Sequence, residues 1–385
     1  MSRVSLRYGF LSTYPPTQCG LATFTAALRE QLTGSAPGGS SGVVRLLDVP
    51  AVPGSLWAAP TGVVGELVAG TAGGPQRAAR LLNRFDVAVV QHEYGIYGGA
   101  DGSEILHLLD QVRVPRVVVL HTVLTDPTAH QRQILESVMA KADAVVAMTM
   151  TARERLAAGY AVDMAKVSII AHGAPVLETT VAEPTFRTGQ FTVLTWGLLG
   201  PGKGIEWGIE AMAMLRDLAP MPRYTVAGQT HPKVLLHEGD AYRDRLHEQV
   251  RQADLGSMVT FDDYYRNTSA LASLVRSADV VLLPYDSTEQ VTSGVLIEAV
   301  AAGKPVVATQ FPHAREMLAE GAGLLVPHRD PAAIAAALRS VMKRGDVMTK
   351  MAAAAAATAP QLLWPVVADQ YRELAGRLIA ASVAA

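Results

Sequence analysis

Short runs of β-branched and other apolar residues alternate along the chain with longer stretches in which apolar residues recur every three or four positions. The short runs predict buried strands and the longer stretches predict amphipathic helices, so their alternation predicts βα units around parallel sheets. In the first half we expect strands at Leu6–Ser12, Val43–Val49, Asp86–Gln91, Arg116–His121, Ala144–Met148 and Val167–Ala171, and helices at Gly20–Leu32, Ser103–Val112, Ala129–Lys141 and Thr151–Gly159.

The periodicity disappears from Glu178 to Gln190, a stretch rich in Glu, Pro, Thr and Gly, which predicts a linker. A second alternation follows, with strands expected at Phe191–Trp196, Tyr224–Ala227, Val259–Phe261, Val280–Leu283, Pro305–Ala308 and Gly323–Val326, and helices at Ile205–Leu218, Tyr242–Asp254, Ser269–Ser277, Ser293–Ala302 and Pro331–Lys343. We therefore predict an α/β protein with two Rossmann-like, doubly wound domains facing a central cleft, where open α/β sheets bind ligands. A last helix begins at Trp364, with an apolar stripe at helical spacing.

Composition narrows the class of protein. With 49% hydrophobic and 18% charged residues, the chain of 385 residues is globular and not disordered. Its 33 Lys and Arg against 35 Asp and Glu are scattered, so we expect no nucleic-acid partner. A single cysteine, Cys19, excludes an intramolecular disulfide. No signal peptide and no apolar run of ~20 residues is present, so we expect a cytoplasmic protein without a transmembrane segment; peripheral membrane contact stays open.

The segment from Asp286 to Thr309 has the order strand, polar loop, helix, Gly and strand. Thr292, Ser293 and Gly294 fall at the helix start, where free N–H groups and the helix dipole favour a phosphate. Glu298, further along the helix, has a carboxylate that could accept hydrogen bonds from a ribose. The local pattern is equally typical of an ordinary N-cap with Glu298 on a solvated face.

A second segment, residues 195–211, runs from a strand through a Gly-rich loop into a helix. Gly197 and Gly202 leave backbone N–H groups open to a diphosphate, and Lys203 adds a positive charge that can stabilise a departing phosphate. The alternative for Lys203 is an exposed loop lysine without a role.

Polar residues also end the predicted strands of the first domain. His92 and Glu93 follow one strand, His121 ends the next and His172 follows a third, while Gly20 opens the first helix. Imidazoles at such an edge can donate to sugar hydroxyls. A metal site at His92, Glu93 and His121 matches no known ligand spacing, so we predict no metal. Buried capping is the alternative for His172, and inert packing is the favoured interpretation of Cys19.

Residues 286–309 resemble the donor-binding signature of retaining glycosyltransferases of the GT-B fold, family GT4 (glycosyl transferases group 1), in which two glutamates stand eight positions apart. Glu298 matches the second glutamate, which in the family holds the nucleotide ribose, whereas Gln290 stands in the place of the first. Lys203 matches a family lysine that is paired with an arginine, but this chain has Leu198 at the arginine's place. His313 lies where family members carry a loop beside the donor, and a solvated helix face is the alternative for it.

The resemblance implies an acceptor domain over 1–185, a nucleotide-sugar donor domain over 186–363, and a helix over 364–385 that packs back on the first domain. It implies retaining transfer from a GDP-, UDP- or ADP-linked sugar to a hydroxyl of a glycan, lipid or small-molecule acceptor, with no cofactor besides this co-substrate and no metal.

The catalytic residues would be His121, Lys203 and Gln290. The donor contacts would be Gly20, Gly197, Gly202, Lys203, Thr292, Ser293, Gly294, Val295, Leu296 and Glu298, with the base held near Gln229 and Asp263–Tyr265. Acceptor or sugar contacts would be His92, Glu93, His172 and His313. Gln290 and Leu198 depart from the family pattern. A GT-B glycoside phosphorylase and a non-catalytic GT-B nucleotide- or glycan-binding protein therefore stay as alternatives.

Overall fold

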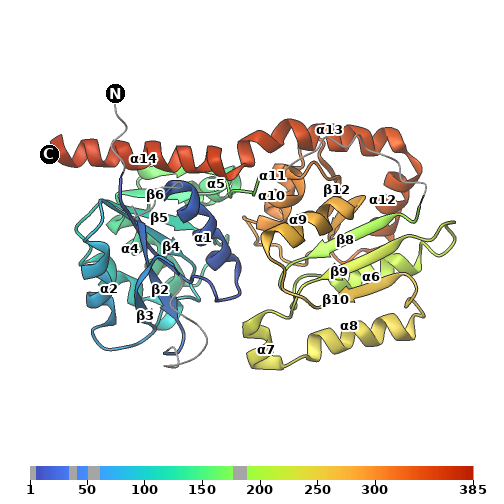
Figure 1. The fold of residues 1–385 in the computed structure, drawn as a ribbon, viewed down its shortest axis with the longest axis horizontal. Helices are drawn as coiled ribbons and strands as arrows, with labels where there is room; N and C mark the ends of the chain where they lie inside the picture. The colour runs from blue at the N-terminus through green and yellow to red at the C-terminus, as the bar shows by residue number, and fades with distance from the viewer. Residues whose placement is uncertain (1–5, 34–40, 51–60, 177–188, 385) are drawn as a thin grey trace. The chain divides into compact units, whose positions relative to one another are not determined.

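The computed structural model describes residues 6–33, 41–50, 61–176 and 189–384, and the chain divides into two compact units (Figure 1). The first unit comprises residues 1–172 and 364–385, and the second comprises residues 173–363. The predicted linker and the predicted boundary at residue 185 fall mainly on residues outside the described part of the chain.

The first unit is built on a parallel sheet of seven strands in the order β3-β2-β1-β4-β5-β6-β7. The strands expected from the apolar runs are present, and β3 was not predicted. Only Leu67 of β3 is buried, because β3 is an edge strand and lacks a continuous apolar run. The bounds are β1 (Tyr8–Ser12), β2 (Ser41–Leu47), β3 (Val63–Val68), β4 (Val87–His92), β5 (Arg116–Leu120), β6 (Ala144–Ala147) and β7 (Val167–Ile169).

Helices cover both faces of this sheet. On one face α1 packs against α14, and together they bury Phe24, Val367 and Tyr371 against the strands. Alternate strand residues such as Leu11 and Val90 supply the opposite face, where α2, α3 and α4 pack. The helices are α1 (Gly20–Thr33), α2 (Gly74–Leu82, not predicted), α3 (Glu104–Leu109), α4 (Ala129–Lys141), α5 (Met150–Gly159) and α14 (Trp364–Ala384), with short 3₁₀ turns at Ala100–Gly102 and Met164–Lys166.

The second unit has a parallel sheet of six strands in the order β10-β9-β8-β11-β12-β13. Each of these strands was expected from its apolar run. Both sheets thus share the order in which the first strand lies between the second and the fourth, which is the doubly wound arrangement. The bounds are β8 (Thr192–Trp196), β9 (Arg223–Ala227), β10 (Val259–Asp262), β11 (Val280–Leu283), β12 (Val306–Thr309) and β13 (Gly323–Val326).

Helices α6, α8 and α12 pack on one face of the second sheet around Ile209, Leu246 and Leu338, and α10 buries a separate apolar group. The predicted first helix of this unit ends early, at Ala213, because the N–H groups of Met214 and Leu215 bond back three residues and close the last turn. The bounds are α6 (Ile205–Ala213), α7 (Pro232–Glu238), α8 (Ala241–Gln252), α9 (Thr268–Ser277), α10 (Gly294–Ala301), α11 (Pro312–Met317), α12 (Pro331–Lys343) and α13 (Gly345–Leu362).

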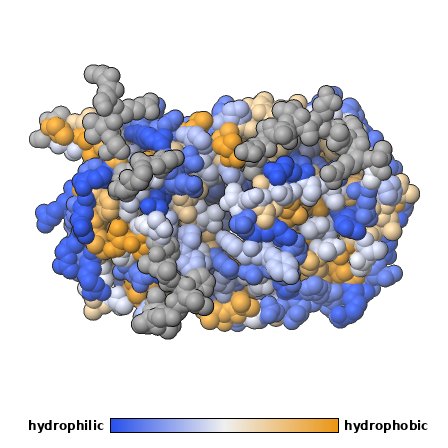
Figure 2. Space-filling model, in the orientation of Figure 1, coloured by the Kyte–Doolittle hydropathy of each residue, from blue (hydrophilic) through white to orange (hydrophobic). Residues whose placement is uncertain are grey.

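Helix α7 has no counterpart among the predicted helices. It has no buried residue, and it leaves Leu235 and Leu236 exposed at 48% and 80%. Figure 2 shows hydrophobic residues at the surface where α7 lies in Figure 1. Within the described residues, none of the helices combines the length and the apolar character that crossing a membrane requires.

The contact of α14 with α1 predicts a large stabilising contribution from Trp364, whose ring lies 5.1 Å from that of Phe24 and is 6% exposed. We expect Trp364→Ala to lower the free energy of unfolding by about 3–5 kcal/mol, because the substitution leaves a cavity under the helix. Urea denaturation followed by circular dichroism measures this loss.

The matched control is Val366→Ala on the same helix, where the side chain is 41% exposed, and its effect should stay within about 0.5 kcal/mol. Equal losses for the two variants would show that α14 does not depend on this contact.

Candidate active site

The site in the second unit forms where the strand order reverses, between β8 and β11. The loop from Gly197 to Gly204 follows β8, and its glycines Gly197, Gly202 and Gly204 have φ angles of +119°, +88° and +61°. A Cβ on Gly204 would lie 1.9 Å from the carbonyl oxygen of Pro284, so only glycine fits there. The N–H of Asp286 donates to the Gly202 carbonyl at 2.9 Å, which ties this loop to the segment after β11.

The start of α10 lies at the same edge of the sheet. The Ser293 hydroxyl accepts the N–H of Leu296 at 3.2 Å, and the N–H of Ser293 donates to Nδ1 of His313 at 2.8 Å. Two of the predicted phosphate donors are therefore already bonded. The N–H groups of Gly294 and Val295 have no acceptor among the described residues, so these two remain available to an anion.

His313 is a buried residue, exposed at only 1%, and the solvated-face alternative for it is wrong. Because its Nδ1 accepts the Ser293 N–H, the ring hydrogen belongs on Nε2. Its predicted sugar contact stays a prediction, whereas its contact with the α10 cap is a fact of the structure.

Glu298 faces the end of β8 from α10. Its Oε2 accepts a hydrogen bond from the indole Nε1 of Trp196 at 3.2 Å, and Trp196 is 4% exposed. Burial raises the pKa of Glu298 to about 7, while the Trp196 hydrogen bond acts in the opposite direction. Glu298 therefore does not lie on a solvated helix face, which was the alternative interpretation.

Gly197 is the second contact between the β8 loop and α10. A Cβ on Gly197 would lie 3.5 Å from Cγ2 of Val295, one of the two residues with an available N–H. The structure thus brings three predicted donor residues, Gly197, Val295 and Glu298, into one place.

Lys203 is half-buried and not a free loop lysine. Its Nζ lies 4.4 Å from the centre of the Tyr285 ring, and that ring stacks on Phe311 at 5.2 Å. A cation over an aromatic face is held by the ring quadrupole. The ammonium group is therefore fixed beside the segment that follows β11.

Gln290 occupies the position of the family's first glutamate. Its side-chain Nε2 donates to the Thr292 carbonyl at 3.0 Å, and its own carbonyl accepts the N–H of His313 at 3.3 Å. These contacts orient the loop before α10. Leu198 is partly exposed and supplies no charge where the family has an arginine.

A second polar group lies at the switch point of the first unit, between β1 and β4. Nε2 of His121 donates to Oε1 of Gln91 at 2.7 Å, and the Thr122 hydroxyl donates to Glu93 at 2.5 Å. The rings of His121 and His172 both lie 5.0 Å from the ring of Phe24. The structure therefore brings His121, His172 and their neighbours on β4 together.

His92 and His121 are uncharged near neutral pH. Burial, with smaller contributions from His172 and His92, lowers the pKa of His121 to about 3, and burial alone lowers that of His92 to about 4. His92 is 1% exposed and packs its ring edge-on against Tyr94. Neutral imidazoles can donate and accept hydrogen bonds but cannot act as cations.

Gly20 begins α1 at an exposed position with open space around it, as the prediction of a ligand contact requires. Beside it, Sγ of Cys19 accepts the N–H of Ala22 at 3.4 Å and lies 3.1 Å from the Thr13 hydroxyl. In the described residues no three His, Cys, Asp or Glu side chains are grouped to hold a metal ion.

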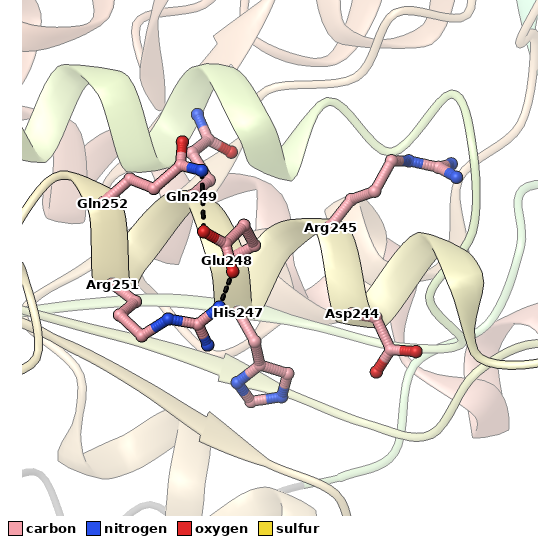
Figure 3. A pocket seen from close by; sticks show the side chains of 7 residues that line it. All are labelled: Asp244, Arg245, His247, Glu248, Gln249, Arg251 and Gln252. Carbon is pink, nitrogen blue, oxygen red and sulfur yellow. Dashed lines mark hydrogen bonds and ion pairs between the residues drawn. The ribbon is translucent and has the colours of Figure 1, made fainter.

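One surface pocket lies along α8 (Figure 3). It is lined by seven residues of this single helix, and within it Glu248 bonds to Arg251 and Gln252. Because it is formed by the surface of one helix and contains none of the predicted site residues, we assign it no function.

Three site residues were missed by the analysis of the sequence. Trp196 bonds Glu298, Tyr285 holds Lys203, and Asp286 accepts from Nε1 of Trp207 at 3.2 Å. Each acts on a residue far away in the sequence, so local spacing carries no signal for it. For Trp196 the available hint was its own position, an aromatic residue directly before the Gly-rich loop.

Comparison with known proteins gives a consistent result. Residues 178–358 match the family model described as Glycosyl transferases group 1. The D-inositol 3-phosphate glycosyltransferase of Kineococcus radiotolerans is 30% identical over 268 residues, covering 65% of this chain and 59% of that protein. The chain thus spans about 59% of the length of this relative.

Two solved structures resemble the whole chain. Anabaena Alr3699/HepE in complex with UDP-glucose has a TM-score of 0.70 at 17% identity, covering 98% of this chain and 99% of that one. Sucrose-phosphate synthase from Thermosynechococcus elongatus has a TM-score of 0.75 at 20% identity, covering 97% and 100%. These likenesses confirm the predicted GT-B fold.

The Glu298 carboxyl predicts a specific dependence of stability on pH. Its pKa is raised in the folded state, so the folded state binds the proton more tightly than the unfolded state and loses stability as pH rises from about 4.5 to about 7. Glu298→Gln keeps the shape and removes the charge. We expect the variant to exceed the wild type in stability at pH 8 by on the order of 3 kcal/mol and to match it near pH 4.

Urea denaturation across this pH range measures the difference, with Glu320→Gln at an exposed position as the control. Parallel pH profiles for wild type and Glu298→Gln would contradict a raised pKa of the half-buried Glu298.

Proposed function

We propose that this chain, a GT-B-fold relative of the glycosyl transferases group 1 through residues 178–358, is a retaining glycosyltransferase. It would take a sugar from a nucleoside diphosphate donor held by the second unit and place it on an acceptor hydroxyl. The GT-B neighbour solved with UDP-glucose supports a nucleotide-sugar donor. The relative whose name specifies D-inositol 3-phosphate suggests a polyol phosphate as the first acceptor to try.

The observation that carries this proposal is the pair of available N–H groups at Gly294 and Val295, with Gly197 and Glu298 beside them. Two adjacent N–H groups at the start of a helix suit the oxygens of a diphosphate. A carboxylate one turn further along α10 suits the ribose hydroxyls. The spacing along α10 therefore matches the phosphate-to-ribose order of a nucleotide.

In the reaction, the bond between C1 of the sugar and the diphosphate oxygen breaks, and a bond from the acceptor oxygen to C1 forms on the same face. The acceptor proton passes to the departing diphosphate. Lys203 and the N–H groups of Gly294 and Val295 would stabilise the charge that develops on the leaving group. No metal is needed in this scheme, because fixed donors supply the charge.

The remaining predicted residues would position the reacting groups. Gln290 would contact the donor sugar through its amide and His121 would lie near C1 as a neutral hydrogen-bonding group. His92, Glu93 and His172 of the first unit and His313 of the second would serve sugar or acceptor hydroxyls. Gly20 and Gly202 would allow close approach of the phosphates.

Nucleotide binding is the first test. A thermal-shift panel of UDP, GDP, ADP, their common sugar conjugates and inorganic phosphate should give a shift with one nucleotide class, since a ligand at 100 times its Kd adds ~2.7 kcal/mol to the folded state. Proton NMR of the product made with D-inositol 3-phosphate then reports the anomeric configuration. An inverted anomer would overturn the retaining mechanism, and a shift with phosphate alone would indicate a phosphorylase.

Lys203→Met separates charge stabilisation from simple binding. We expect kcat to fall about a hundredfold while the Kd of the preferred nucleoside diphosphate changes by less than about tenfold. Lys350→Met, at a side chain that is 82% exposed, is the control for loss of a lysine and should leave both constants unchanged. Parallel losses in kcat and affinity would make Lys203 a binding residue only.

A further inference from the structure

Helix α8 carries one buried cation, Arg243, whose guanidinium reaches the carboxyl ends of β9 and β10. The residue is 8% exposed. Its Nη2 donates to the Gly228 carbonyl at 2.6 Å, its Nε donates to the Thr230 hydroxyl at 3.3 Å, and its Nη1 pairs with Asp263. All three nitrogens of the guanidinium are thus bonded to loops that follow the two strands.

These loops are joined to the Gly-rich loop through Gly228. Gly228 has a φ of +133°, and a Cβ there would lie 1.9 Å from the carbonyl oxygen of Gly197. The N–H of Leu199 donates to the Gln229 carbonyl at 2.8 Å, and the N–H of His231 donates to the Leu199 carbonyl at 2.8 Å. Arg243 therefore holds segments after β9 and β10 and, through Gly228, supports the loop after β8.

Packing of α8 does not explain the arginine. Tyr242, Leu246 and Val250 already anchor the helix in the core of the second unit. Taking a guanidinium out of water is costly unless its donors are matched, and here the matching groups belong to two different loops. Asp263 keeps 59% of its side chain exposed, so it neutralises the charge without being buried itself.

We propose that Arg243 is a positioning residue that shapes the nucleobase pocket of the donor site from the loops 228–231 and 262–265. This proposal rests on the proposed function, which places a nucleotide in the second unit. Gln229, between the two β9-loop groups that Arg243 binds, is partly exposed, and its N–H has no acceptor among the described residues. The edge of a nucleobase has acceptors that the Gln229 N–H can recognise. The diphosphate would instead bind the N–H groups at the start of α10.

The test compares a ligand that has a base with one that lacks it. Isothermal titration with UDP, GDP, ADP and inorganic pyrophosphate would be run on the wild type, Arg243→Met and Arg243→Lys. For Arg243→Met we expect the affinity for the preferred nucleoside diphosphate to fall about tenfold or more, with a flattened preference among the three bases. Pyrophosphate affinity should stay the same. Arg243→Lys should recover part of the loss, because an ammonium can bond one loop but lacks the planar fork.

Two further variants keep the test decisive. Arg245→Met removes an exposed arginine of the same helix, which Figure 3 shows among the pocket residues of α8, and should change nothing. Asp263→Asn removes the charge that pairs with Arg243, at a side chain that is 59% exposed, but keeps an amide oxygen as acceptor. It should weaken base discrimination in the same direction as Arg243→Met.

Equal losses for nucleoside diphosphate and pyrophosphate would overturn the assignment. So would a lower melting temperature with unchanged base preference, because that pattern describes a purely structural arginine. A wild type that binds none of the three nucleotides would instead refute the proposed function, and the assignment with it.

Discussion

Close contact of main chain with main chain is the constraint on which the second unit depends. The carbonyl of Pro284 fills the space next to Gly204, and the carbonyl of Gly197 fills the space next to Gly228. No side chain fits at either place, so the loops after β8, β9 and β11 pack directly on one another. The strand ends are thereby fixed with their polar groups pointing at a common edge, and the remaining features of the site follow from that arrangement.

The first consequence is electrostatic. Once β8 and α10 are held together, Trp196 lies over Glu298, and burial raises the pKa of that carboxyl to about 7. Ser293 and His313 satisfy the neighbouring cap, which leaves Gly294 and Val295 as open donors in the described residues. A polar ligand that brings both acceptors and hydroxyls would thus meet groups that are already positioned, so little reorganisation energy would oppose binding.

Sequence patterns predicted the fold well where burial is continuous. The strands with unbroken apolar runs were all found, because a parallel strand covered on both faces requires such a run. Strand β3 and helices α2 and α7 were not predicted. Strand β3 buries mainly Leu67 and α7 has no buried residue, whereas α2 buries mostly small residues such as Ala78 and Ala79, which give a weak apolar pattern. The glycines and Glu298 of the candidate site were visible as local motifs. The pairs Trp196–Glu298 and Arg243–Gly228 were not, because tertiary packing joins them and no local periodicity records it.

The two units differ in the kind of polar group that they present, and this difference fits a division of chemical labour. In the first unit His92 and His121 are held neutral by burial, so they offer hydrogen bonds without charge. Hydroxyl groups of sugars and polyols are neutral and are recognised by such donors and acceptors. In the second unit the start of α10 and the ammonium of Lys203 provide positive potential, which a diphosphate requires. Under the proposed function, the cationic groups would face the diphosphate and the neutral histidines would face hydroxyl groups, which avoids the desolvation cost of a cation facing a neutral sugar.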